Sequence, residues 1–158
     1  MSNVKSGKED NAVPTSRVTD DTVIAEIVSR TISPEQVVRR IKTENSGCVA
    51  TYVCLIRDNS HGKAVLSVEY RDDSGKAREG LAAIAKEIAD KFPVNKVGLF
   101  HRVGVLKVGD INFVAAIAAS HRQEGFAACA YAVDRFKEQM PTLKKETYLD
   151  GSTRSEWG

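Results

Sequence analysis

The stretch INFVAAIAASHRQEGFAACAYAVDRFKEQM, residues 111–140, decides the fold because its pattern changes from strand to helix. Residues 111–119 form an apolar run of strand length. Ser120 and Gln123 then have the spacing of a capping box, which predicts the start of a helix. Pro141 ends that helix. Its buried side is expected to carry Phe126, Ala130, Val133, Phe136 and Met140.

Strand and helix signals alternate along the rest of the chain. Residues 48–56, 64–70 and 96–103 have the composition of strands. A helical repeat of apolar residues over 77–92 is closed by Pro93, and Ser33-Pro34 starts an earlier helix that stops near Gly47. The last predicted element is an extended piece over residues 142–149. Residues 22–29 alternate weakly, which leaves a strand and a helix both open.

The order of these elements predicts the fold class. Three helices separate two strand pairs and a final strand, and sequential strands pair most simply as antiparallel neighbours. We therefore expect an α+β fold, with a mainly antiparallel sheet and helices on one side. The domain is expected to cover residues 21–158, and the polar residues 1–20 are predicted to be a disordered tail.

Composition excludes several classes of function. The net charge of the 158 residues is only +2, and no aromatic side chains are interleaved with basic ones, so a nucleic-acid module is not indicated. No apolar run spans a bilayer and no hydrophobic signal core is present, which predicts a cytoplasmic protein. The three cysteines lack metal-ligand spacing and are expected to be reduced and buried. Neither a nucleotide-binding glycine pattern nor a metal-ligand constellation occurs, so neither a cofactor nor a metal is expected.

His121 and Arg122 are predicted to lie in the first turn of the third helix. Free backbone amides and the helix dipole attract anions there, and two basic side chains in this place suggest a bound phosphate. A simpler interpretation is also open at this point. Arg122 could be solvated or ion-paired, while His121 merely packs.

Lys137 stands near the end of the same helix, and Lys144 and Lys145 follow Pro141 on the extended piece. The proline forces a corner, which can direct two ammonium groups at one pocket, where one lysine would act as nucleophile or proton acceptor. Alternatively, these lysines only interact favourably with the negative end of the helix dipole at the C-terminus of the helix. Arg57 follows a strand and could present its charge from a rigid support. We interpret His101-Arg102 as structural or interfacial.

Taken together, these motifs resemble the large subunit of molybdopterin synthase. The resemblance covers roughly residues 44–157 and several motifs agree in order and spacing. They are Leu55-Ile56-Arg57 at a strand end, the 97–109 stretch around His101-Arg102, Ser120-His121-Arg122, Phe126 to Cys129, Asp134 to Lys137, and Pro141 to Glu146. Leu143 replaces a tryptophan of the family, and Cys54 stands where glycine is common.

The resemblance implies an α/β-hammerhead-like fold and a sulfurtransferase activity in molybdenum cofactor biosynthesis. The family's large subunit binds a small ubiquitin-like sulfur carrier, whose Gly-Gly tail ends in a thiocarboxylate, and converts cyclic pyranopterin monophosphate to the dithiolene of molybdopterin. By motif matching, Lys137 and Lys144 would be catalytic. The residues implied to bind the substrate are Leu55, Ile56, Arg57, His121, Arg122, Lys145 and Glu146. The alternative is a non-catalytic adaptor that binds the carrier's tail.

Helix length adds one inference about assembly. Arg122 and Lys137 are fifteen positions apart, or about 22 Å at 1.5 Å per residue. That distance exceeds the span of a pterin phosphate. The sequence therefore predicts a homodimer in which one chain supplies His121 and Arg122 to its partner's site, joined by two small carriers into a heterotetramer.

Overall fold

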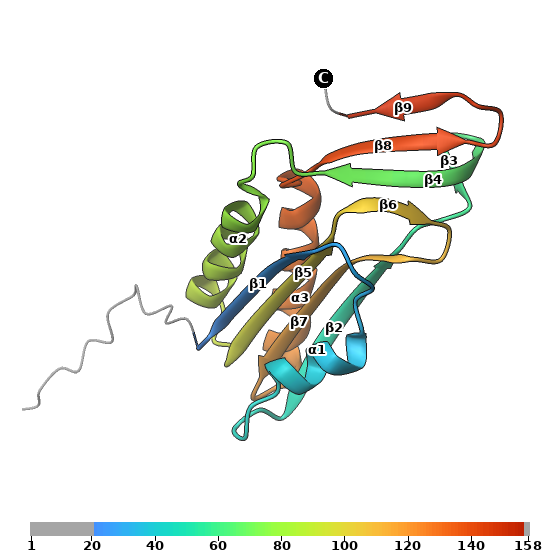
Figure 1. Ribbon diagram of the computed structural model, residues 1–158. Helices are drawn as coiled ribbons and strands as arrows, with labels where there is room; N and C mark the ends of the chain where they lie inside the picture. Colours follow the sequence, from blue (N-terminus) through green and yellow to red (C-terminus); the bar gives the residue numbers. More distant parts are fainter. Residues whose placement is uncertain (1–20, 157–158) are drawn as a thin grey trace, which may run out of the picture.

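The computed structural model describes residues 21–156, which contain three helices and nine strands (Figure 1). The helices are α1 (Pro34–Ile41), α2 (Ala77–Lys91) and α3 (Arg122–Glu138). The strands are β1 (Val23–Val28), β2 (Cys48–Leu55), β3 (Asn59–Ser60), β4 (Lys63–Arg71), β5 (Lys96–Arg102), β6 (Gly104–Lys107), β7 (Ile111–Ala119), β8 (Leu143–Tyr148) and β9 (Thr153–Ser155). The expected disordered tail over residues 1–20 lies outside the described residues.

The strands form two sheets. The first has the order β1-β5-β7-β2, and the second has the order β3-β4-β8-β9 with β6 also paired to β4. All pairs are antiparallel except β1 with β5, so the expected α+β class with mainly antiparallel strands is confirmed. Residues 22–29, left open by the sequence, contain the parallel edge strand β1.

The sequence predicted two pairs of sequential antiparallel strands. The pair at 96–103 and 111–119, β5 with β7, is confirmed, whereas the pair at 48–56 and 64–70 is wrong. Instead β2 pairs with β7 and β4 pairs with β8, so these two neighbours in sequence belong to different sheets. The break between them falls at Ile56, whose backbone bonds to Asp110 and Gly109 beyond the end of β7's pairing. The chain passes from the first sheet to the second here, between β2 and β4, and a cavity lies at this junction.

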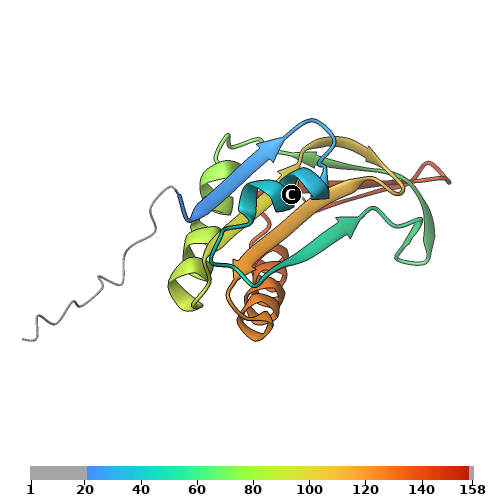
Figure 2. The ribbon, with the colours of Figure 1, turned by 90° about the horizontal axis from the view of Figure 1, so that it is seen from below.

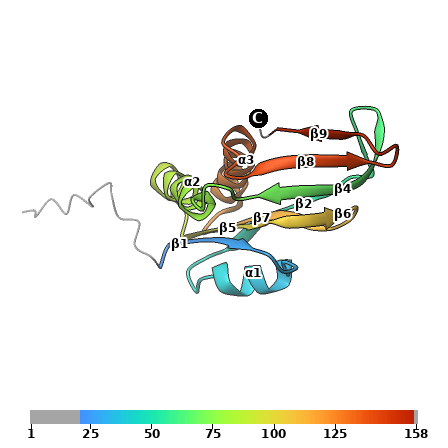
Figure 3. The same cartoon turned by 45° about the horizontal axis from the view of Figure 1, so that its top comes forward.

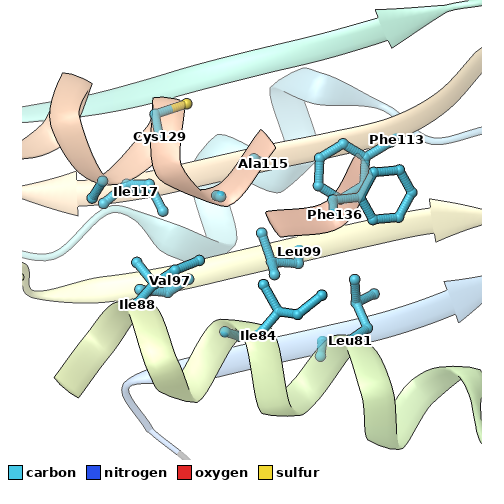
Figure 4. Packing of buried hydrophobic residues seen from close by; sticks show 14 of the residues in the cluster. Leu81, Ile84, Ile88, Val97, Leu99, Phe113, Ala115, Ile117, Cys129 and Phe136 are labelled. Atoms are coloured by element: carbon cyan, nitrogen blue, oxygen red, sulfur yellow. The ribbon is translucent and has the colours of Figure 1, made fainter. Parts of the chain in front are cut away.

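One face of the first sheet is covered by α2 and α3 (Figure 4). Leu81, Ile84 and Ile88 of α2 pack against Val97 and Leu99 of β5, all nearly inaccessible to water. At the other end of this layer, Phe136 of α3 stacks on Phe113 of β7 with ring centroids 3.8 Å apart and planes 5° from parallel. This contact fixes the C-terminal end of α3.

The opposite face is covered by α1, which corrects the expectation that all helices lie on one side (Figures 2 and 3). Val37 and Ile41 of α1 pack on Phe100 and on alternate residues of β7. Because successive strand residues point to opposite faces, β7 must be apolar at nearly every position to serve both layers. Its residues from Asn112 to Ala119 are all buried.

The start and the buried side of α3 also differ from the sequence prediction. His121, and not the predicted Ser120, is the N-cap residue, and its side chain makes no capping bond. The Ser120 hydroxyl donates to the Asn45 carbonyl instead of capping the helix. Phe126 is 67% exposed, and Ala130 is exposed as well. The buried side is formed by Gly125, Ala128, Cys129, Ala132 and Phe136.

Small residues explain why α3 turns this side, and not the predicted one, toward the sheet. A Cβ atom on Gly125 would lie 3.2 Å from the Cys48 sulfur and 3.5 Å from the Ala50 Cβ. The helix backbone therefore approaches the sheet closely along its small residues, and Phe126 is turned outward. Within residues 21–156, no helix is long and apolar enough to cross a membrane.

Two phenylalanines on α3 test this assignment of the helix faces. We expect Phe136→Ala to lower the free energy of unfolding by about 3–5 kcal/mol, because it removes a buried ring and leaves a cavity. Phe126→Ala should change it by less than about 0.5 kcal/mol. Urea unfolding followed by circular dichroism measures both values. Equal losses in the two variants would contradict the observed helix orientation.

Candidate active site

A cavity of about 750 Å³ lies at the junction of the two sheets, beside the end of α3. Its walls come from β2, from the β2–β4 connection, from β4, β7 and β8, and from the α3–β8 corner. The lining residues are Tyr52, Val53, Cys54, Leu55, Ile56, Arg57, Asn59, Ser60, His61, Val65, Val68, Tyr70, Asn112, Phe136, Lys137, Met140, Lys144, Glu146 and Glu156.

Lys137 and Lys144 both lie on the wall of this cavity, although they belong to different elements. Lys137 is in the last turn of α3, while Lys144 is the second residue of β8. The chain turns between them at Pro141 and Thr142. Leu55, Ile56 and Arg57 reach the same cavity from the end of β2.

Lys144 is held in place by a buried carboxylate. Its Nζ lies 3.2 Å from Oε1 of Glu146, whose side chain is only 8% exposed. The other oxygen, Oε2, accepts a 2.5 Å hydrogen bond from the Tyr148 hydroxyl. Burial by itself would raise the pKa of Glu146, but hydrogen bonds from Tyr148, Ser60 and Lys144 outweigh it and lower the pKa below its usual value. Glu146 therefore stays ionised and keeps Lys144 oriented.

Lys137 and Arg57 are different in this respect. Neither cationic group has a hydrogen-bond or ion-pair partner among residues 21–156, and both residues are exposed at the cavity. A cation that is not neutralised by the protein is available to an anion in the cavity. The cavity thus combines one tethered lysine with two cations that are free to bind a ligand.

Three of the expected site residues lie elsewhere. His121 and Arg122 are exposed at the opposite end of α3, and neither lines the cavity. Lys145 does not line it because side chains alternate along β8, so it points away from the face that carries Lys144 and Glu146.

Sequence reasoning missed the polar side of the cavity. Asn112 donates from Nδ2 to the Tyr70 hydroxyl at 3.0 Å, and both residues are buried. Burial raises the pKa of Tyr70 well above its usual range, so its hydroxyl keeps its proton. The one signal available in the sequence was Asn112 itself, a polar residue inside the apolar run of β7.

The cysteines divide into two kinds. Cys129 is buried in α3, and burial raises the pKa of its thiol to about 11, so it stays protonated at neutral pH. Cys48 and Cys54 are free and only half-buried, which corrects the expectation that all three are buried. Cys54 lines the cavity near Tyr52.

This arrangement defines a class: an α+β domain with a cavity that brings two lysines and an arginine together. Comparison with known proteins agrees. The family model described as "MoaE protein" matches residues 27–139. The chain is 32% identical over 125 residues to the molybdopterin synthase catalytic subunit of Halalkalibacterium halodurans, covering 79% of this chain and 80% of that one. It is 30% identical over 151 residues to the human catalytic subunit, covering 92% and 80%.

Structural comparison gives the same answer. The crystal structure of molybdopterin synthase from Staphylococcus aureus superposes with a TM-score of 0.78 at 30% identity, covering 85% of this chain and 97% of the other. The chain belongs to the MoaE family. It is accordingly the catalytic kind of molybdopterin synthase subunit, a sulfurtransferase of molybdenum cofactor biosynthesis.

The carboxylate that holds Lys144 can be tested by titration. Tyr148→Phe removes the hydroxyl that donates to Glu146, so the pKa of Glu146 should rise toward its usual value. The stability that Glu146 contributes is present above the pKa of an unfolded glutamate and is lost as pH falls through its lower folded pKa. Carbon-13 NMR titration of the carboxyl group measures this shift. Tyr131→Phe, which affects Glu87 instead, is the control, and an unchanged Glu146 titration would contradict the assignment.

Proposed function

We propose that the cavity brings together the thiocarboxylate tail of a small ubiquitin-like sulfur carrier and cyclic pyranopterin monophosphate, and that two sulfur transfers there make the molybdopterin dithiolene. The observation that carries this proposal is the meeting of Lys137, Lys144 and Arg57 on one cavity. Both proposed ligands are anionic, and the protein supplies the cations. The cytoplasmic location expected from the sequence belongs to this proposal as well.

The mouth of the cavity fits an extended peptide tail. Val53 and Leu55 line the cavity and are 36% and 52% exposed, which is unusual for apolar residues of a strand. Both lie on β2, at the edge of the first sheet. A narrow tail ending in two glycines can pass such a surface without side chains that would block the way. Its terminal thiocarboxylate would then reach Lys137.

The two lysines have different roles in this proposal. Lys137 has no partner among the described residues, so its amine can contact the carbonyl carbon or the sulfur of the thiocarboxylate and can give or accept a proton. Lys144 is tied to Glu146, so it acts from a fixed position, stabilising the negative charge that develops as sulfur attacks the pterin side chain.

Two further basic residues, His121 and Arg122, are proposed to help Arg57 bind the phosphate of the pterin. Arg57 is the cation at the strand end of the cavity. His121 and Arg122 belong to the opposite end of the 17-residue helix α3, about 22 Å from Lys137 along the axis. We propose that they come from the second copy of a homodimer, and that two carriers complete a heterotetramer.

Replacing Lys137 tests the catalytic assignment. Lys137→Ala should lower the rate of dithiolene formation by about 10²–10⁴-fold, because proton transfer and nucleophilic help are lost while the cavity remains. The exposed Lys86→Ala on α2 is the matched control and should leave the rate unchanged. A single-turnover assay with thiocarboxylated carrier measures it. Tail binding without dithiolene formation in the unmodified protein would instead favour the adaptor alternative.

The proposal that each site combines Lys137 of one chain with Arg122 of the other can be tested by mixing two variants. Lys137→Ala and Arg122→Ala homodimers should each be nearly inactive, whereas mixing and re-associating them creates heterodimers with one intact site. Because random exchange makes half of the dimers mixed, and each of these has one of two sites intact, about a quarter of the original activity should return. No recovery after demonstrated subunit exchange would refute the sharing of residues between chains.

A further inference from the structure

His101 lies at the point where the elements that carry both lysines meet. Its ring is fully buried, and the residue does not line the cavity. The ring contacts Phe136 and Tyr70 edge to face, with centroids 5.0 Å away in each case. Phe136 immediately precedes Lys137 in α3, and Tyr70 is the cross-strand neighbour of Lys144.

Hydrogen bonds complete this central position. Nδ1 of His101 lies 2.7 Å from the Asn112 carbonyl oxygen, and Nε2 lies 2.7 Å from the Thr142 hydroxyl. Thr142 forms the corner between α3 and β8, two residues before Lys144. The His101 ring therefore contacts Phe136, the residue before Lys137, and Thr142, at the corner that leads to Lys144. It also contacts Tyr70 of β4, the strand paired with β8.

The chemistry of these partners fixes the tautomer. A carbonyl oxygen only accepts, so Nδ1 must carry the hydrogen that it shares with Asn112. Burial lowers the pKa of His101 to about 4, so the ring is neutral near pH 7. Nε2 then has a free lone pair, and the Thr142 hydroxyl must donate to it. The corner is thus oriented by a single directed hydrogen bond.

We propose that His101 is a positioning residue for sulfur transfer, which sets the separation of Lys137 and Lys144 by holding the α3–β8 corner through Thr142. It touches no substrate, because the ring lies behind the cavity wall. The inference rests on the proposed roles of the two lysines. Displacement of a catalytic group by about 1 Å costs on the order of 10²-fold in rate, so a bond of this kind affects turnover more than binding.

Thr142 offers a nearly isosteric test. Thr142→Val removes only the hydroxyl, and we expect kcat for sulfur transfer to fall about 10- to 100-fold while KM and the carrier's Kd change less than about threefold. Thr142→Ser keeps the hydroxyl and should restore kcat to within a few-fold. Thr147→Val, on the strand β8 that follows the corner, is the control for the change of residue type. Assays are run well below the melting temperature of each variant.

The position of the hydrogen on His101 gives a readout that is independent of activity. Nitrogen-15 NMR of the ring should show hydrogen on Nδ1 and a bare Nε2, and Thr142→Val should shift the Nε2 resonance. His101→Asn retains a donor for the Asn112 carbonyl but cannot reach Thr142, so it should lose kcat as Thr142→Val does, with little additional loss when the two are combined.

Several results would overturn the proposal. These are hydrogen on Nε2, an unchanged kcat in Thr142→Val, a lower melting temperature as the only effect, or failure of serine to restore the rate. The proposed function fails separately. If Lys137→Ala retains full activity, the catalytic assignment is wrong whatever the Thr142 variants show, whereas the nitrogen resonances still report the hydrogen bond.

Discussion

Small side chains on both surfaces let α3 lie directly on β7, and the place of each cavity residue follows from that contact. Gly125, Ala128 and Ala132 bring the helix backbone close to the sheet, and the stacked pair of Phe136 and Phe113 ends the interface. A helix seated this closely cannot shift along the sheet without steric overlap. Lys137, one residue after Phe136, is therefore delivered to the junction of the two sheets rather than to open solvent.

Lys144 and Lys137 are held in place by different means. Lys144 on β8 is restrained by an ionised carboxylate that is itself hydrogen-bonded, whereas Lys137 is restrained only through the packing of its helix. One cation is thus oriented electrostatically and the other by the backbone that carries it. The unpaired ammonium group of Lys137 carries no desolvation penalty of a buried charge, because the residue lies exposed at the cavity.

The sequence predicted the elements well but only one of the two expected strand pairs, β5 with β7. Ser33, Pro93 and Pro141 marked helix ends by local chemistry, which a sequence displays directly. Pairing of β2 with β7, rather than with β4, depends on distant residues that compete for the same strand, and no local pattern records the outcome. The predicted burial of Phe126 is wrong for a related reason. Its hydrophobicity favours burial, but the close approach of helix and sheet backbones leaves room only for the smaller residues beside it. The cavity's lysines were visible through their motifs, whereas His101 and Asn112 acquire their roles only from contacts across the fold.

The pairing of strands distant in sequence also has a consequence for how the protein folds. β1 joins β5, β2 joins β7, and β4 joins β8, so three of the seven strand pairs each close a long loop of chain. Folds dominated by such contacts have high contact order and fold slowly, on the order of milliseconds to seconds. On the ribosome, the second sheet cannot be completed until β8 has emerged, although β4 can already pair with β3 and β6. The pocket therefore forms last, and a nascent chain that has already built its helices against the first sheet still exposes an unfinished site.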